Sequence, residues 1–201
     1  MSFGMFGSVF LLAQFLQTVQ HYSPLSAGLH TLPWTGMPVL VAPLAGWFSD
    51  RFGGRPLLIA GLFLQATGLA WLAAILQPTT PYADVVPAFI ISGVGMALFF
   101  VPVANVVLGS VSRELEGIAS GTNNAIREIG GVFGVAVLGA VFSARGGYSS
   151  GQAFSHGLTP ALWVGAVVVA AGAFVAFAIP QRGSEIADAA IGEMSLEPAL
   201  A

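Results

Sequence analysis

Stretches of about twenty mainly apolar residues, separated by short polar breaks, repeat along the chain as far as Pro180. An α-helix needs roughly 20 such residues to cross a hydrocarbon core about 30 Å thick. The pattern therefore predicts six membrane-spanning helices, at residues 3–20, 28–48, 56–76, 85–109, 118–143 and 159–179. The expected fold is all-α, a polytopic transmembrane six-helix bundle within residues 1–180.

Composition points the same way. Hydrophobic residues make up 56% of the chain and charged residues only 7%, whereas a soluble domain carries about a quarter charged residues. Residues 181–201 are different, because they are acidic and contain too few apolar residues for a core. We expect this segment to be a disordered cytoplasmic tail.

The arginines predict the orientation in the membrane. Arg51 and Arg55 follow the second predicted span, Arg113 the fourth and Arg182 the sixth, whereas the opposite connections hold only Arg145. Because cytoplasmic loops carry the excess of basic residues, we expect a multi-pass protein of the cell membrane with both termini cytoplasmic.

Several classes of function are not expected. The chain has no cysteine, and it lacks H-E-x-x-H, G-x-S-x-G and P-loop motifs. It also has no basic run of the kind that binds nucleic acid. We therefore predict no enzymatic activity, no metal site, no cofactor and no nucleic-acid partner. Membrane lipid is the expected surrounding.

Helix-breaking and small residues inside the spans carry structural information. Pro33, Pro38 and Pro43 each remove a backbone hydrogen bond from the second span, which predicts a bent helix. Such prolines can serve as a hinge or can simply be the prolines common in membrane helices. Gly130 and Gly134 have the small-xxx-small spacing that lets another helix approach closely, so we expect them to pack helices together.

A charged segment between the second and third spans is the most specific motif. It runs from Gly46 to Arg55 and places an aspartate and two arginines among glycines: Gly46, Asp50, Arg51, Gly53 and Arg55. Glycines permit a tight turn, and an aspartate at a helix end can accept from amides or pair with arginine. The preference for arginines in cytoplasmic loops would explain the two positive charges of this segment. It would not explain the spacing of the glycines and the aspartate.

This segment resembles the G-x-x-x-D-R-x-G-x-R signature that follows the second helix of each half in major facilitator superfamily transporters. The stretches Gln17 to Pro33 and Gly121 to Gly131 are similar to the carboxy-terminal half of the fourteen-span drug:proton antiporter branch. The resemblance implies two three-helix inverted repeats packed against an amino-terminal six-helix half, with the substrate path between the halves. It also implies that Asp50 and Arg51 belong to a gating contact between those halves.

The function implied by the resemblance is a transporter module, part of a proton-coupled multidrug or metabolite efflux protein that works by alternating access on small amphipathic or apolar substrates. The alternative is a truncated, non-transporting membrane protein, or a partner subunit of another half-transporter. The two interpretations differ in whether a second bundle with a titratable acid completes the transporter.

Polar residues within the spans are candidates for a coupling or substrate path. Arg127 and Glu128 fall early in the fifth span, and each has an asparagine four residues before it, at Asn123 and Asn124. Burying unpaired charge is costly, so partners or water are expected there. The simpler interpretation is an interfacial helix start in which Arg127 extends to lipid headgroups.

A second polar group comes from other spans. Gln14 and Gln17 lie at helical spacing on the first span, and Asn105 lies in the fourth. Such side chains are expected to face protein or a cavity, where they can contact substrate or hydrogen-bond between helices. In the fourth span, Phe99 and Phe100 next to Pro102 are candidates for an apolar pocket lining.

Overall fold

The computed structural model describes residues 1–108 and 111–178. These residues are almost entirely helical. The elements in chain order are α1 (Ser2–Thr18), α2 (Pro24–Thr35), α3 (Met37–Phe52), α4 (Gly54–Ile75), α5 (Tyr82–Leu108), the 3-10 turn η1 (Arg113–Leu115), α6 (Glu116–Arg145) and α7 (Gly151–Ala176). The predicted all-α bundle is confirmed. The predicted tail, 181–201, lies outside the described residues.

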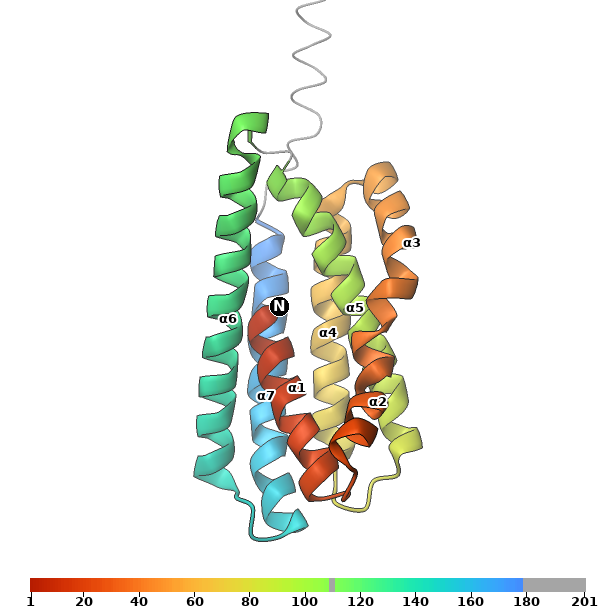
Figure 1. Cartoon of the computed structure of the whole chain (residues 1–201), viewed down its shortest axis with the longest axis vertical. Coiled ribbons are helices and arrows are strands. Elements are labelled where there is room, and N and C mark those ends of the chain that lie inside the picture. The colour runs from red at the N-terminus through yellow and green to blue at the C-terminus, as the bar shows by residue number, and fades with distance from the viewer. Residues whose placement is uncertain (109–110, 179–201) are drawn as a thin grey trace, which may run out of the picture.

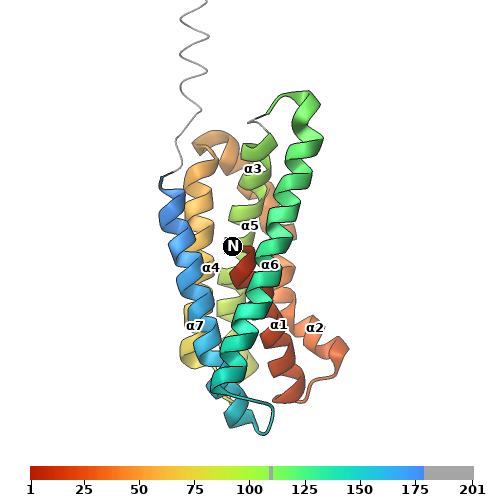
Figure 2. The same ribbon diagram turned by 90° about the vertical axis from the view of Figure 1, so that its left-hand side faces the viewer.

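The helices run up and down along one long axis (Figure 1). One end of the bundle holds the junction between α3 and α4 and the connection from α5 to α6, and we call it the signature end. The opposite end holds the connections from α1 to α2, from α4 to α5 and from α6 to α7 (Figure 1). The amino terminus lies part-way along the axis, so that α1 lies beside the part of α6 nearer the opposite end (Figure 2).

Four segments are long and apolar enough to cross a membrane by length and composition: Gly54–Ile75, Tyr82–Leu108, Arg113–Arg145 and Gly151–Ala176. α1 is a shorter apolar helix of 17 residues. The fold is therefore that of a multi-pass membrane protein.

The predicted bend in the second span is confirmed as a break between two helices. α2 ends at Thr35 and α3 begins at Met37, with Gly36 between them. Pro38 has no N–H to donate to the carbonyl of Trp34, so the helical ladder is interrupted here. α5 fills the bend closely, since a Cβ on Gly93 would lie 2.6 Å from that carbonyl oxygen.

Some predicted boundaries were wrong. The sixth span was placed at 159–179, yet α7 begins at Gly151, because the Ser150 hydroxyl caps it by accepting from the amide of Ala153. The second span was placed from residue 28, yet α2 begins at Pro24 after a similar cap by Ser23. In both cases polar residues at the end of the bundle had suggested a loop. The second span was also ended four residues early, at 48 instead of Phe52, and the other boundaries differ by one to three residues.

α4 forms the centre of the packing, in contact with both α5 and α7. Gly61 and Gly95 meet where α4 crosses α5: a Cβ on Gly61 would lie 2.7 Å from the Gly95 oxygen, and a Cβ on Gly95 2.6 Å from the Gly61 oxygen. The two backbones therefore touch, as small residues permit between membrane helices. Around them lies a core of buried aromatic and leucine side chains, which includes Phe15, Leu69, Leu72, Phe89, Phe142, Phe154, Leu158 and Leu162.

Two helices leave broad apolar faces uncovered. Half of the most apolar 18-residue window of α4 is buried, whereas only 22% of that of the segment containing α6 is buried. Val132 and Phe133 on α6 and Val39 and Leu40 on α3 are among the exposed side chains. Apolar exposure on this scale fits lipid or another protein surface better than water.

Candidate functional site: the signature end and the charged cluster on α6

The signature segment is mostly helical. Asp50 and Arg51 lie in the last turn of α3, and the single residue Gly53 separates α3 from α4. Gly53 has φ +82°, a conformation that side chains with a Cβ rarely adopt, so glycine is required at this reversal. The Arg51 guanidinium lies over the ring of Trp47, 5.5 Å from its centroid. The turn is thus compact, and it presents charge at the end of the bundle.

Arg55 ties the signature segment to the last helix. Its Nη2 donates a hydrogen bond to the backbone oxygen of Phe177, directly after α7. The carbonyls at the end of a helix lack partners within the helix and carry the negative end of its dipole, so a guanidinium here satisfies both. This hydrogen bond joins the start of α4 to the end of α7.

Asp50 and Gly46 make fewer contacts. Among the described residues, no ion pair joins Asp50 to Arg51 or Arg55, and Asp50 is exposed. A Cβ on Gly46 would meet nothing within 4 Å. Packing within this bundle therefore does not explain the aspartate or the first glycine of the motif.

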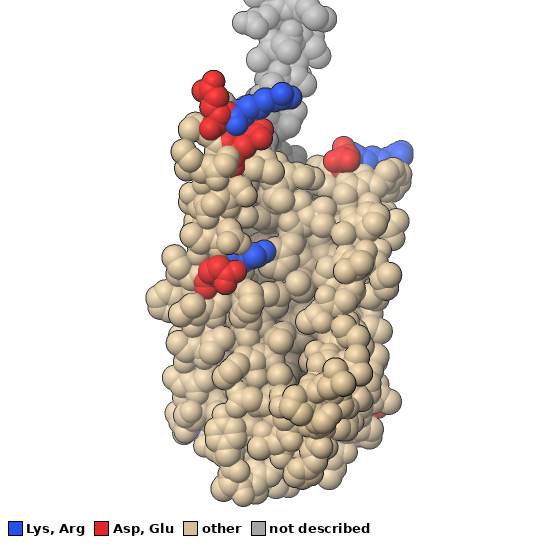
Figure 3. Space-filling view, viewed as in Figure 1, with Lys and Arg blue, Asp and Glu red and all other residues tan. Residues whose placement is uncertain are grey.

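Charged side chains gather at the signature end, and one further pair lies on the side of the bundle (Figure 3). The pair is Arg127 and Glu128, whose closest atoms are 3.5 Å apart. Arg127 Nη2 also donates to Asn124 Oδ1 at 2.8 Å, and its guanidinium lies 5.6 Å from the ring centroid of Phe100 on α5. The structure thus brings Asn124, Arg127 and Glu128 together with an aromatic ring from a neighbouring helix.

The cluster lies well inside the helix. α6 begins at Glu116, eleven residues before Arg127, which corresponds to roughly 16 Å at about 1.5 Å per residue. An open apolar groove of about 430 Å³ adjoins it, lined by Phe6, Glu128, Gly131, Val132, Val135 and Ala136. A carboxylate at the edge of an apolar groove can hold a proton or the cationic group of an amphipathic molecule.

The remaining candidate residues are not part of this cluster. Gln14 accepts a hydrogen bond from the Tyr148 hydroxyl at 2.6 Å, and Gln17 donates to the backbone oxygen of Ala13. Both glutamines therefore lie near the opposite end. Asn105 is exposed on α5, and Asn123 is half-buried on α6.

The two glycines of the small-xxx-small pair contact α1 to different degrees. A Cβ on Gly134 would clash with the backbone oxygen of Phe3, whereas a Cβ on Gly130 would meet its nearest atom, Ser2 Cβ, at 3.5 Å. On the α1 side, a Cβ on Gly7 would lie 2.6 Å from the Gly134 oxygen. The tight crossing therefore involves Gly7 and Gly134.

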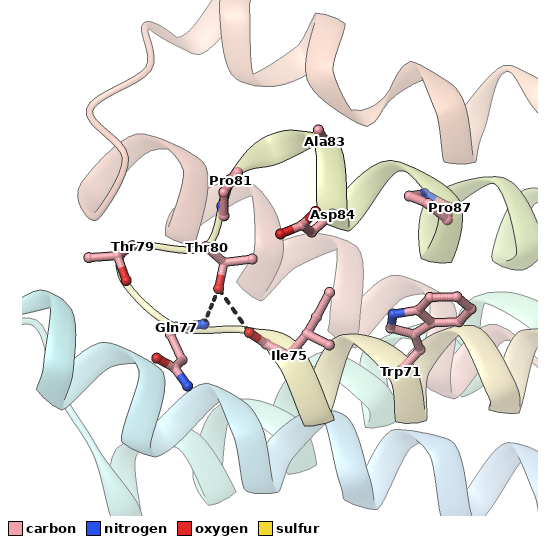
Figure 4. Close-up of a pocket in the computed structure, with 9 residues that line it drawn as sticks. All are labelled: Trp71, Ile75, Gln77, Thr79, Thr80, Pro81, Ala83, Asp84 and Pro87. Carbon is pink, nitrogen blue, oxygen red and sulfur yellow. Dashed lines mark hydrogen bonds between the residues drawn. The ribbon is translucent and has the colours of Figure 1, made fainter.

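A further pocket lies at the opposite end, beside the connection from α4 to α5 (Figure 4). It measures about 550 Å³ and includes Trp71, Thr79 and the carboxylate-bearing Asp84. Sequence reasoning treated the lining of this pocket only as a connection between two spans. It also did not place Phe6 beside Glu128, because that contact depends on how helices far apart in the sequence meet. Within residues 1–108 and 111–178 no three acidic or histidine side chains are grouped as a metal site would require.

Comparison with known proteins identifies the family. The model of the Major Facilitator Superfamily matches residues 1–195. The chain belongs to the Major Facilitator Superfamily.

Several relatives of this superfamily member are named for export or drug resistance. The Tetracenomycin C resistance and export protein of Streptomyces glaucescens is 33% identical over 73% of this chain and 27% of its own length. The Multidrug resistance protein Stp of Mycobacterium tuberculosis is 37% identical over 71% of this chain and 26% of its own length. The Puromycin resistance protein pur8 of Streptomyces alboniger is 30% identical over 88% of this chain and 35% of its own length. The chain thus spans about a quarter to a third of the length of these relatives.

Proposed function

We propose that this chain is the carboxy-terminal six-helix bundle of a proton-coupled exporter of small amphipathic or apolar compounds, in the cell membrane with both termini cytoplasmic. The observation that carries the proposal is the cluster of Asn124, Arg127 and Glu128 beside an apolar groove, on a helix face that this bundle leaves uncovered. Ionisable side chains within membrane helices are costly and typically mark transport pathways.

A division of roles follows from the chemistry of the cluster. The apolar groove accommodates the apolar part of a substrate. Glu128 is the acid of the cluster that we assign to proton uptake and release, and its carboxylate lies 3.5 Å from the guanidinium of Arg127. Protonation of Glu128 would weaken the ion pair and free Arg127, which gives a way to link proton uptake to movement at this face.

The second element of the proposal is an amino-terminal six-helix half that covers the exposed faces of α3 and α6. Alternating access then consists of the two halves rocking around a site between them. The exposed apolar side chains of both helices support such a partner. Asp50 and Arg51 lie at the signature end, in the last turn of α3. We assign them to the gating contact with that half.

The experiment is proton-driven efflux of a fluorescent amphipathic cation from cells that carry the intact exporter. We expect Glu128→Gln to abolish the dependence of efflux on the pH gradient, because the amide cannot titrate. Glu116→Gln is the matched control, since Glu116 lies on the same helix at its exposed start. The coupling role is wrong if Glu128→Gln and Glu116→Gln behave alike.

The second candidate function is a non-transporting membrane protein or a partner subunit of another half-transporter. Exposed apolar faces would serve a partner subunit equally well. Deleting the gene tests the non-transporting candidate: an exporter, or a subunit of one, predicts more dye retained in the deleted cells, and a non-transporting protein predicts no change.

A further inference from the structure

A second polar pocket lies at the opposite end of the bundle, away from the charged cluster. It measures about 560 Å³, and three segments form it: residues 76–78 after α4, Arg145 at the end of α6, and the first turns of α7. α7 contributes Gln152, Ser155, His156, Thr159 and Trp163. Their spacing of three or four residues places them on one face of the helix.

Close backbone packing fixes the position of Arg145 beside this face. A Cβ on Gly157 would lie 2.6 Å from the backbone oxygen of Phe142, and a Cβ on Gly146 would lie 2.6 Å from the Cα of Gly157. The end of α6 therefore touches the second turn of α7 without intervening side chains. Arg145 directly precedes this contact, which places its backbone beside the pocket.

The pocket offers hydrogen-bond donors and no carboxylate. Arg145 has no ion pair among the described residues, and the lining adds side-chain donors from Gln77, Gln152 and Thr159. Ser155 is only 8% exposed, and its buried Oγ has no hydrogen-bond partner in the structure. A buried hydroxyl without a partner costs free energy, so an acceptor from a bound group would stabilise it.

We propose that this pocket binds a phosphate group, carried by a membrane phospholipid or free in solution. A guanidinium with nearby neutral donors matches the charge and the several acceptor oxygens of phosphate. Two features favour the lipid source. Trp163 lines the pocket on the side toward the middle of the bundle, as aromatic side chains do at membrane interfaces. Val167, one turn further along α7, is exposed and apolar, which suits an acyl chain.

The test measures retained lipid on the purified protein by native mass spectrometry after incubation with phosphatidylglycerol. Diacylglycerol, which lacks the phosphate, is the lipid control, and inorganic phosphate alone is the second probe. We expect Arg145→Gln and Ser155→Ala each to weaken binding about tenfold or more, as for the loss of a hydrogen bond to a charged group. Arg113→Gln, at the signature end, is the matched control and should bind as the unaltered protein does.

The outcomes separate the two sources and can overturn the proposal. Retention of phosphatidylglycerol that inorganic phosphate does not displace identifies a lipid headgroup. Binding of inorganic phosphate that Arg145→Gln abolishes, with no preference for the lipid over diacylglycerol, identifies free phosphate. The proposal is overturned if neither probe is bound, or if Arg145→Gln and Arg113→Gln bind both probes equally. Removing an unpartnered hydroxyl should not destabilise the ligand-free protein. Loss of binding by Ser155→Ala would therefore reflect the lost contact with phosphate and not a misfolded protein.

Discussion

Replacing Gly134 with alanine should loosen the packing of α1 on α6. The added methyl group would clash with the backbone oxygen of Phe3, which cannot rotate away as a side chain could. The two helices would have to separate. Overpacking of this kind lowers the free energy of unfolding by about 1–3 kcal/mol. The better helix propensity of alanine raises it by roughly 0.5–1 kcal/mol.

Gly130→Ala is the matched comparison, because it makes the same chemical change one turn earlier on the same helix. Its Cβ would meet Ser2 Cβ at 3.5 Å, an ordinary contact. The gain in helix propensity is shared by both variants and cancels in the comparison. The difference between them therefore measures the packing term, and we expect Gly134→Ala to be less stable than Gly130→Ala by about 1–3 kcal/mol.

The assay is unfolding in mixed micelles by titration with sodium dodecyl sulfate, followed by circular dichroism. A difference of 1.4 kcal/mol corresponds to about tenfold in the unfolding equilibrium. Gly139→Ala is a second control, since a Cβ there would meet nothing within 4 Å. Equal stability of the Gly134 and Gly130 variants would refute the close crossing and with it the placement of α1 on α6.

Three further predictions concern the charged residues. Asp50→Asn in the intact exporter should reduce efflux while membrane insertion stays normal, and unchanged drug efflux would remove the gating role. Arg127→Gln should impair efflux because it removes both the ion pair with Glu128 and the contact with Phe100; near-normal efflux would favour an arginine that merely extends to headgroups. Arg55→Gln should lower stability by about 0.5–1.5 kcal/mol through loss of the hydrogen bond to Phe177, measured by the same micelle titration, with Arg113→Gln as the control that should leave stability unchanged.

Hydrophobic runs and helix breakers were enough to predict the main features of the fold. Runs of apolar residues report directly on which segments can lie in a membrane. Of the six predicted spans, four correspond to described helices that are long and apolar enough to cross a membrane. Pro38 removes a specific donor, so the bend at Gly36 could be anticipated. The start of α7 was missed because Gln152 and His156 are polar, and polarity at the end of a bundle does not distinguish a loop from the first turns of a capped helix.

The site was less predictable, because its contacts join distant parts of the chain. Helical spacing paired Asn123 with Arg127 and Asn124 with Glu128. In the structure Arg127 instead contacts Asn124 and Glu128. Phe100 lies on another helix, and nothing in its sequence neighbourhood indicates a ring beneath a guanidinium. The partner of Arg55, the backbone oxygen of Phe177, has no sequence signal at all, since any residue carries a carbonyl. Gln14 and Gln17 were grouped with the substrate path, and the structure places them nearer the opposite end.

The central claim is that this bundle is one half of a two-bundle exporter, and the mass of the native polypeptide tests it most directly. An antibody against residues 181–201 would detect that polypeptide in its native membrane by denaturing electrophoresis. A second six-helix half predicts a band at least about twice the 20.6 kDa of this chain. A band at 20.6 kDa would contradict the claim.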